Sequence, residues 1–384
     1  GRSCYTDVLA AGGYTCALSG KWHLGDTLDP QHGFSYWFCH PCGGGRYNDM
    51  EMIREGEIVR TAGYVTEVIT DEAVEFIKGR TETEGPFYLS VHYTAPHSPW
   101  VNEHPEDIVA EYDGCPFKSC PQEASHPWAA GYYMTEDHMG DRESLKGYFA
   151  AVTAMDRNVG RILDTLDALE LRERTLVVFM SDNGFSCGQH GFWGKGNGTW
   201  PLNVYENSVK VPAIFSYPER IPAGRVSGAM ASQYDVLPTL LDYAGLSGSE
   251  AARAVGVREA ELPGASLAPV LSERTNQARE EIVVYDEYGP VRMIRTPEWK
   301  YVHRYPYGPH ELYDMASDPC ERRNLVDDGD RAGVVGEMRG RLVRWFERYV
   351  EPARDGARLP VSGYGQYERI DDRCRGEEAF RPRG

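Results

Sequence analysis

The sequence lacks any run of apolar residues long enough to cross a membrane. Such a span needs roughly 18 to 20 consecutive apolar residues, and no stretch of the chain approaches that length. The residues that follow Gly1 also differ from a leader in which a charged segment precedes an apolar one. We therefore expect no membrane span.

Positive charge is scarce as well. The chain carries 40 Lys and Arg against 58 Asp and Glu, which gives a formal net charge of −18. This balance argues against nucleic acid or an anionic membrane as a partner, because such surfaces recruit proteins with a positive field. An anionic substrate would have to meet a local basic pocket. Lysines are the rarer cations, and they are Lys21, Lys78, Lys118, Lys146, Lys195, Lys210 and Lys300.

Closely spaced cysteines are also few. Of nine cysteines, only Cys39 with Cys42 and Cys115 with Cys120 are near neighbours in the sequence. A zinc site would need four soft ligands at paired spacing, and the flanking prolines and glycines indicate loops. Zinc and a local Cys115–Cys120 disulfide remain alternatives to ordinary thiols, which we favour.

The pattern of apolar residues predicts a layered α/β domain. A length of 384 residues with 41% apolar content can build a large core. Apolar runs followed by polar or glycine-rich loops predict buried strands at 87–93, 175–180 and 211–216. Helical periodicity appears at 5–11, 65–77, about 143–171 and 236–243. Their alternation favours a mostly parallel central sheet.

A different pattern follows. Residues 247–277 are typical of a connector, and short strands are predicted at 281–285, 291–294 and 299–304, before a helix at 334–349. This order favours a small antiparallel α+β subdomain. We therefore divide the chain into a large domain, 1–270, and a C-terminal subdomain with its tail, 271–384. The last thirty or so residues have little pattern.

Two segments place histidine on constrained loops. Lys21 and His23 lie between Gly20 and Gly25, so an extended backbone would point both side chains to the same side. Lys offers a compact charge for a tetrahedral anion, and His can move a proton near neutral pH. A surface turn is the alternative. His97 lies between two prolines just after a predicted strand, a usual place for site residues, whereas His92 within that strand is better interpreted as a packed histidine.

Two further segments offer ligands. Asp182 and Asn183 follow the strand predicted at 175–180, and their oxygens suit calcium or magnesium. A plain turn is equally compatible with Asp-Asn-Gly. Lys195 lies among glycines and aromatic residues, where its ammonium group can reach a small anion. A solvated loop lysine is the alternative there.

Together these segments resemble the sulfatase family of the alkaline-phosphatase superfamily. The order Gly-Lys-Trp-His-Leu-Gly, Ala-Pro-His-Ser-Pro, Ser-Asp-Asn-Gly and Gly-Lys-Gly is similar to the motifs of that family. The resemblance continues through 211–214, 234–240, 311–314, 318–319 and 324–325, and it spans about residues 5 to 326. It implies an alkaline-phosphatase-like fold and hydrolysis of a small-molecule or glycan sulfate ester.

The resemblance also implies roles. Asp182 and Asn183 correspond to ligands of a divalent cation, usually calcium, with magnesium as the alternative, and Asp182 would also help to activate the nucleophile. Lys21 and Lys195 correspond to a clamp on the sulfate oxygens. His97, with Lys195, corresponds to the donor to the leaving oxygen. His23 corresponds to the base that later helps to release sulfate. Lys21, His97 and Lys195 would thus bind substrate.

The nucleophile of the family is missing from the expected position. Family enzymes use a formylglycine made from Cys or Ser in a Cys/Ser-x-Pro-x-Arg motif that precedes the Lys21 segment, and no cysteine here is followed by that pattern. Ser216 begins the only serine match, but it follows the Asp182 motif, so we reject it. We expect the formylglycine, and the acidic pair that completes the metal site, upstream of Gly1.

Two other functions stay open. A phosphonate or phosphate ester hydrolase of the same superfamily could use the same cation and the same Lys and His side chains. A non-catalytic member would only bind sulfated ligands. Aromatic and histidine side chains at 101–141 could stack on a sugar, but a packed insertion is the favoured interpretation. They are His104, His126, Trp128, Tyr132, Tyr133 and His138.

We predict that the 384-residue chain alone shows no sulfatase turnover and only weak cation binding. Two oxygen ligands are too few for calcium, which takes six to eight, and loss of an upstream central strand would leave two unpaired sheet edges. The test measures aryl-sulfate turnover and calcium-dependent thermal stabilisation of this chain beside an upstream-extended form. Enzyme-like turnover by the chain alone would contradict the prediction and bring Ser216 back into consideration.

Overall fold

The computed structural model describes residues 3–24, 27–41, 43–80, 85–129, 133–286, 291–305 and 307–357. The helices of this part are α1 (Tyr5–Ala11), α2 (Val65–Lys78), α3 (Glu106–Ala110), α4 (Tyr133–His138), α5 (Arg142–Ala168), α6 (Glu206–Val209), α7 (Val236–Tyr243), α8 (Glu250–Ala254), α9 (Ala268–Leu271) and α10 (Ala332–Tyr349). The strands are β1 (Thr15–Gly20), β2 (Phe34–Cys39), β3 (Glu51–Arg54), β4 (Glu57–Arg60), β5 (Phe87–His92), β6 (Val177–Met180), β7 (Ser186–Cys187), β8 (Trp193–Gly194), β9 (Ala213–Ser216), β10 (Ile282–Tyr285), β11 (Val291–Arg295), β12 (Trp299–Arg304) and β13 (Glu311–Asp314).

A five-stranded mixed sheet in the order β4-β3-β2-β1-β5 forms the centre of the large layer. Strand β1 pairs in parallel with both β2 and β5, and β3 and β4 extend the sheet as an antiparallel hairpin. Ala17 faces a cluster that includes Phe76 and Leu166, whereas Cys16 and Leu18 face a cluster around Leu9 of α1. Helices therefore cover both faces, which confirms the predicted α/β class with parallel strands.

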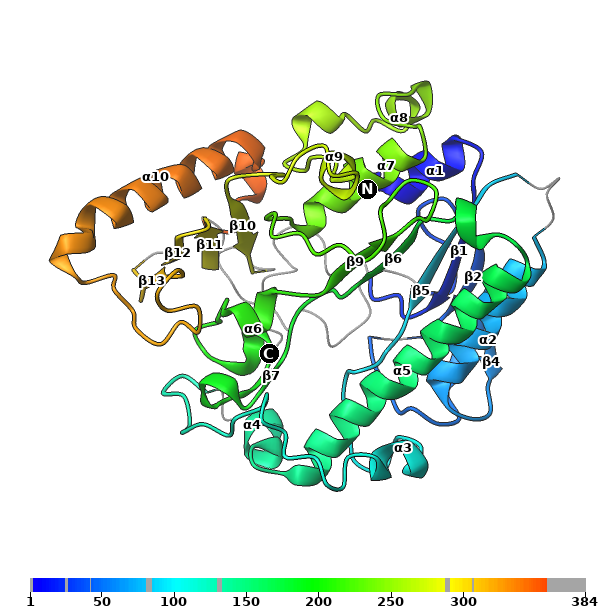
Figure 1. The fold of residues 1–384 in the computed structure, drawn as a ribbon, viewed down its shortest axis with the longest axis horizontal. Helices are drawn as coiled ribbons and strands as arrows, with labels where there is room; N and C mark the ends of the chain where they lie inside the picture. The colour runs from blue at the N-terminus through cyan, green and yellow to red at the C-terminus, as the bar shows by residue number, and fades with distance from the viewer. Residues whose placement is uncertain are drawn as a thin grey trace.

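Helices α2 and α5 lie side by side along one face of this sheet (Figure 1). In α2 the buried residues Val65, Ile69, Ala73 and Ile77 recur every four positions and form one apolar stripe. Helix α5 begins at Asp141, whose side chain accepts hydrogen bonds from the backbone N–H groups of Glu143 and Ser144. Both helices match the periodicity of the sequence to within a few residues.

Strands β6 and β9 form a separate antiparallel ribbon. Both strands were predicted, but their antiparallel pairing was not, since strand direction depends on the path of the chain between them. Among the described residues, β5 pairs only with β1, and β6 pairs only with β9. Each of these two strands thus has one edge that is unpaired within the described part of the chain.

The C-terminal part forms a four-stranded antiparallel sheet in the order β10-β11-β12-β13. Helix α10 packs on it through Met338, Leu342 and Phe346, which contact Ile294 and Tyr301 among others. Figure 1 shows α10 (orange) along the outside of this sheet. The predicted antiparallel α+β subdomain is confirmed, whereas its boundary at residue 270 stays a prediction.

Some local predictions were wrong or incomplete. The segment 247–277 was predicted as a connector, yet it contains α8 and α9; Ser249 caps α8 by accepting a hydrogen bond from the N–H of Ala252. The hairpin β3–β4 was not predicted, because its strands are only four residues long. Residues 358–384, most of the patternless tail, lie outside the described residues. No helix of the described part has the length and apolar character to cross a membrane.

A buried ion pair joins the C-terminal sheet to the segment around α6. Lys300 of β12 is fully buried, with its Nζ 2.6 Å from the carboxylate of Glu321 and 3.2 Å from that of Glu206. Burial raises the pKa of Glu321, and the charge of Lys300 opposes that rise. One of the seven lysines therefore has a structural role in the interior.

We predict that Lys300→Met lowers the free energy of unfolding by about 3 kcal/mol or more, because a buried carboxylate would lose its cation. Lys78→Met is the matched control; that side chain is 55% exposed in its pair with Glu75, so its loss should cost less than about 1 kcal/mol. Denaturant titration measures both. Equal effects would show that the Lys300 pair does not hold the two parts together.

Candidate functional site

The ends of β1 and β5 are tied by a reciprocal backbone and side-chain contact. The N–H of Lys21 donates to the carbonyl oxygen of His92 at 2.7 Å, and Nδ1 of His92 donates to the carbonyl oxygen of Lys21 at 2.9 Å. A Cβ at Gly20 would lie 2.1 Å from the His92 oxygen, so only glycine permits this approach. Burial lowers the pKa of His92. His92 is thus the packed histidine predicted, and it fixes the backbone at Lys21.

The loop after β5 holds His97 from several sides. Its N–H donates to the carbonyl oxygen of Thr94, and its carbonyl oxygen accepts a hydrogen bond of 2.7 Å from the hydroxyl of Tyr47. Trp100, buried in the core, donates from Nε1 to the carbonyl oxygen of Pro96 at 2.8 Å. Nδ1 of His97 donates to the carbonyl oxygen of Ser98 at 2.9 Å. The residue is exposed, and the second ring nitrogen, Nε2, is left for another partner.

Charged residues from distant parts of the chain act on His97. Desolvation lowers its pKa, and the charges of Lys21 and Lys195 lower it further, whereas the charge of Asp182 opposes them. Asp182 also raises the pKa of His92. Electrostatic effects of this kind require proximity. The structure therefore brings Lys21, His97, Asp182 and Lys195 into one neighbourhood.

His23 joins this neighbourhood through a glycine pair. A Cβ at Gly43 would lie 2.2 Å from Nε2 of His23, and a Cβ at Gly44 would lie 3.3 Å from Cε1 of His97. The backbone at 43–44 thus packs against both imidazoles. Gly43 to Gly45 were predicted only as loop residues beside Cys42; the run of three glycines was the signal that another group comes close to this backbone.

The loop after β6 presents Asp182 and Asn183. Oδ1 of Asp182 accepts a hydrogen bond of 2.9 Å from the N–H of Asn183, and the hydroxyl of Ser181 donates to the carbonyl oxygen of Asn183. Nε2 of Gln233 donates to the carbonyl oxygens of Ser181 and Asp182 at 2.8 and 2.7 Å. This role of Gln233, which lies beside the 234–240 motif, was not predicted from the sequence. The loop is therefore a tight turn, and these hydrogen bonds fix the backbone at Asp182.

The oxygen donors of this loop fit a hard divalent cation in type but not in number. A carboxylate and an amide oxygen suit calcium or magnesium. Within the described ranges, however, no two further Asp, Glu, His or Cys side chains lie close enough to Asp182 to form a three-residue cluster with it. These two residues alone do not complete a calcium site.

Lys195 follows a short buried hairpin. Strands β7 and β8 pair Ser186 with Gly194 and Cys187 with Trp193. Trp193 is completely buried, and the carbonyl oxygen of Lys195 accepts hydrogen bonds from the N–H of Gly198 and from Nδ2 of Asn203. The half-buried lysine therefore extends from a rigid base.

The region 101–141 packs as an insertion, as predicted. His104 hydrogen-bonds the hydroxyl of Tyr64, and His126 that of Tyr205. Arg304 lies over the ring of Trp128, and His138 hydrogen-bonds Ser144. Tyr132 and the side chain of Tyr133 lie outside the described residues. The described members of this set are therefore held by the protein itself.

Ser216 lies far from the Asp182 loop. In the β6–β9 ribbon Ser216 is opposite Val177, whereas Met180, which precedes the Asp182 loop, is opposite Ala213. Ser216 and Met180 therefore lie at opposite ends of the ribbon, three residue positions apart along it, which is roughly 10 Å at the rise of a strand. The register agrees with the rejection of Ser216 as the nucleophile.

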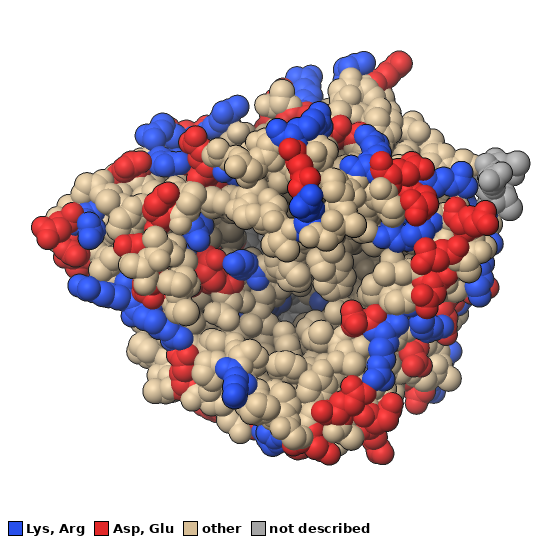
Figure 2. All heavy atoms as spheres, in the orientation of Figure 1, with Lys and Arg blue, Asp and Glu red and all other residues tan. Residues whose placement is uncertain are grey.

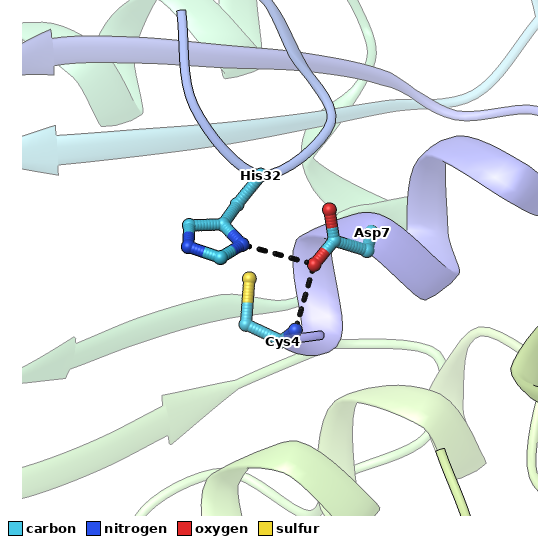
Figure 3. Close-up of side chains that lie close together, drawn as sticks. All are labelled: Cys4, Asp7 and His32. Atoms are coloured by element: carbon cyan, nitrogen blue, oxygen red, sulfur yellow. Dashed lines mark hydrogen bonds and ion pairs between the residues drawn. The ribbon is translucent and has the colours of Figure 1, made fainter. Parts of the chain in front are cut away.

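One other cluster offers metal ligands. Cys4, Asp7 and His32 lie close together where α1 begins (Figure 3), with one ligand atom from each residue within 4.8 Å of the others. The Asp7 carboxylate, however, accepts from the N–H of Cys4 at 2.7 Å and lies 3.1 Å from Nδ1 of His32. Burial raises the pKa of the Cys4 thiol. These contacts cap the helix and attach the loop before β2, and we assign them no chemistry.

Figure 2 shows a hollow near the middle of one face, in the region that Figure 1 draws between β9 and α6. Lys or Arg atoms are visible at its floor. The protein as a whole is strongly acidic, so this is the kind of local basic pocket that an anionic substrate requires.

We predict that the pKa of His97 responds in opposite directions to two substitutions. Lys195→Met should raise it, because a positive charge that disfavours the imidazolium is removed, and Asp182→Asn should lower it further. Proton NMR titration of the ring in the presence of a chelator measures both shifts. Lys210→Met, at an exposed lysine, is the control. A pKa unchanged in the first two variants would show that these charges do not act on His97.

Comparison with known proteins identifies the family to which this chain is similar. Residues 3–246 match the family model "Sulfatase", and residues 188–348 match "N-sulphoglucosamine sulphohydrolase, C-terminal". The chain is 27% identical to an N-acetylglucosamine-6-O-sulfatase of Bacteroides thetaiotaomicron, over 91% of this chain and 73% of the relative. It is 29% identical to a choline-sulfatase of Rhizobium meliloti, over 89% and 71%.

The fold has solved counterparts. One structure, a complex with its substrate D-glucosamine-2-N,6-O-disulfate, superimposes with a TM-score of 0.74 at 24% identity and covers 90% of this chain and 82% of its own. The family match covers more than half of the chain, and both the sheet arrangement and the ordered motifs agree with it. The chain therefore belongs to the sulfatase family of sulfuric ester hydrolases.

Proposed function

We propose that this protein hydrolyses a sulfate ester at a site built from Lys21, His23, His97, Asp182, Asn183 and Lys195. The observation that supports it most directly is the electrostatic environment of His97, whose pKa is lowered by desolvation and by the charges of Lys21 and Lys195, while the charge of Asp182 acts in the opposite direction. Two cations, one carboxylate and an imidazole in one place can bind an anionic ester and pass a proton to its leaving oxygen.

The two lysines bind the sulfate group in this proposal. Lys21 follows β1, and Lys195 follows the β7–β8 hairpin, so they approach the substrate from different layers. Their ammonium groups hold two sulfate oxygens and stabilise the charge that develops there in the transition state. The rigid backbone at each lysine limits the reorganisation needed when substrate binds.

His97 gives a proton to the leaving oxygen. Its Nδ1 is committed to the carbonyl oxygen of Ser98, so Nε2 is the nitrogen that can donate to substrate when the ring is protonated. His23, which packs against Gly43, takes a proton in the later step that releases sulfate. The two imidazoles thus have separate tasks beside one glycine pair.

Asp182 and Asn183 contribute oxygen ligands to a divalent cation, for which calcium is the proposed ion. Sulfatases in general use a divalent metal and a formylglycine nucleophile. A cation bound here would polarise a sulfate oxygen; the remaining ligands come from outside this pair.

The proposed substrate class is a sulfate ester carried by a carbohydrate. The relative from Bacteroides thetaiotaomicron is named for an N-acetylglucosamine 6-sulfate, and the solved structure binds D-glucosamine-2-N,6-O-disulfate. The relative named choline-sulfatase indicates that the family also acts on sulfate esters of other alcohols. The proposal of a sugar substrate therefore needs a direct test.

In a form of the protein that carries the family nucleophile, we predict that His97→Ala and Lys195→Ala lower turnover of an unactivated sugar sulfate by about 10²-fold or more. The loss should be smaller with an aryl sulfate whose leaving group needs no proton. Steady-state kinetics on both substrates make the comparison, with Lys210→Ala as the control at an exposed lysine.

Two outcomes of this experiment would change the proposal. Equal losses on both substrates would remove the acid role from the residue that shows them. Faster turnover of a matched aryl phosphonate than of the aryl sulfate would favour a phosphonate ester hydrolase on the same site.

A further inference from the structure

Two cysteines far apart in the sequence lie together in the fold. The thiols of Cys187 in β7 and of Cys120 in the 101–141 insertion lie close enough for each to shift the pKa of the other, and both side chains belong to one buried cluster. Both are buried, with 3% and 8% of their surface exposed. Neither takes part in the proposed sulfatase chemistry, so their proximity is a separate feature of the molecule.

The backbones on either side of this pair are held together by hydrogen bonds. Nε2 of Gln122 donates to the carbonyl oxygens of both Cys120 and Cys187, each at 2.8 Å. Nε2 of Gln189 donates to the carbonyl oxygen of Ser119 at 2.6 Å. The two cysteine carbonyl oxygens therefore lie within about two hydrogen-bond lengths of each other, so the two backbones run close together at this point.

Glycine at position 188 makes this approach possible. It has a positive φ of 109°, and a Cβ there would lie 2.5 Å from Nε2 of Gln122 and 2.7 Å from the carbonyl oxygen of Pro121. A side chain would push the insertion away from β7. The close contact between the two segments is thus built into the backbone and does not depend on the thiols alone.

The surroundings favour a single partner for Cys120. An apolar cluster that includes Trp100, Phe117 and Trp193 encloses both sulfurs. Cys115 packs against the same cluster, but the thiol that acts on Cys120 is that of Cys187: Cys187 lowers the pKa of Cys120, and Cys120 raises the pKa of Cys187. Cys120 is therefore the more acidic thiol of the pair and the one that attacks a disulfide first.

We propose that Cys120 and Cys187 form a disulfide that fastens the 101–141 insertion to the hairpin from which Lys195 extends. Cys187 pairs with Trp193 across that hairpin, two residues before Lys195. The bond closes a loop of roughly 70 residues, a length for which the chain-entropy account predicts a clear gain in stability. This position differs from the local Cys115–Cys120 pair that sequence spacing allowed.

The reaction balances with a small-molecule disulfide such as glutathione disulfide as oxidant. The Cys120 thiolate attacks one sulfur of the oxidant, the bond between its two sulfurs breaks, and one thiolate leaves. Cys187 then attacks the Cys120 sulfur of the mixed disulfide and displaces the second thiolate. Two protein thiols are oxidised, one disulfide is reduced to two thiols, and the two protons pass from the cysteines to the released groups.

The experiment oxidises the purified chain with glutathione disulfide, blocks the remaining thiols and digests without reduction. Mass spectrometry should find one linked pair of peptides that contain Cys120 and Cys187, and two fewer alkylated cysteines than in the reduced chain. The melting temperature should rise by about 3 °C or more on oxidation and return when reductant is added.

Two variants make the assignment specific. Cys187→Ser should abolish both the linked peptides and the dependence of melting temperature on oxidant, whereas Cys115→Ser should keep both. A Cys115–Cys120 linkage, or Cys120 and Cys187 that stay fully alkylatable after oxidation, would overturn the proposal. No readout is sulfatase activity, so the result is independent of the proposed function.

Discussion

The parallel alignment of β1 with β5 is the constraint on which the site depends. The two strands run side by side with Gly20 opposite His92, so the segments that follow them, with Lys21 and His97, leave the sheet at the same edge. The hydrogen bonds between Lys21 and His92 then set the backbone at that edge. Any larger residue at position 20 would have a Cβ that clashes with the carbonyl oxygen of His92.

The sequence predicted elements that depend on local interactions better than it predicted contacts between distant segments. Helices α1 and α7 and strand β12 match the predicted bounds, since local periodicity determines them. The antiparallel pairing of β9 with β6 was beyond that reasoning, because the pairing depends on how the chain returns. The α8 helix was missed for a different reason: five residues cannot establish a helical period.

The site shows the same division. The order of the motifs indicated which residues to consider. The position of Lys195 depends on the β7–β8 hairpin, and its strands of two residues each are too short to be predicted from a periodic pattern. The place of Gly43 against His23 was missed as well. Cys120 gives the clearest case, since its neighbour in sequence is Cys115 and its neighbour in space is Cys187.

The charges around His97 have a consequence for the order of events in catalysis. In the free protein, desolvation of the ring and two ammonium groups lower the pKa of His97, which disfavours the protonated ring that a general acid requires. A sulfate ester is an anion, and one held between Lys21 and Lys195 would offset their field at the imidazole. The pKa of His97 would then rise when substrate binds, so that the proton is taken up at the moment when the leaving oxygen needs it. In the proposed site, Lys21 and Lys195 would thus couple the protonation of His97 to the binding of the anionic substrate.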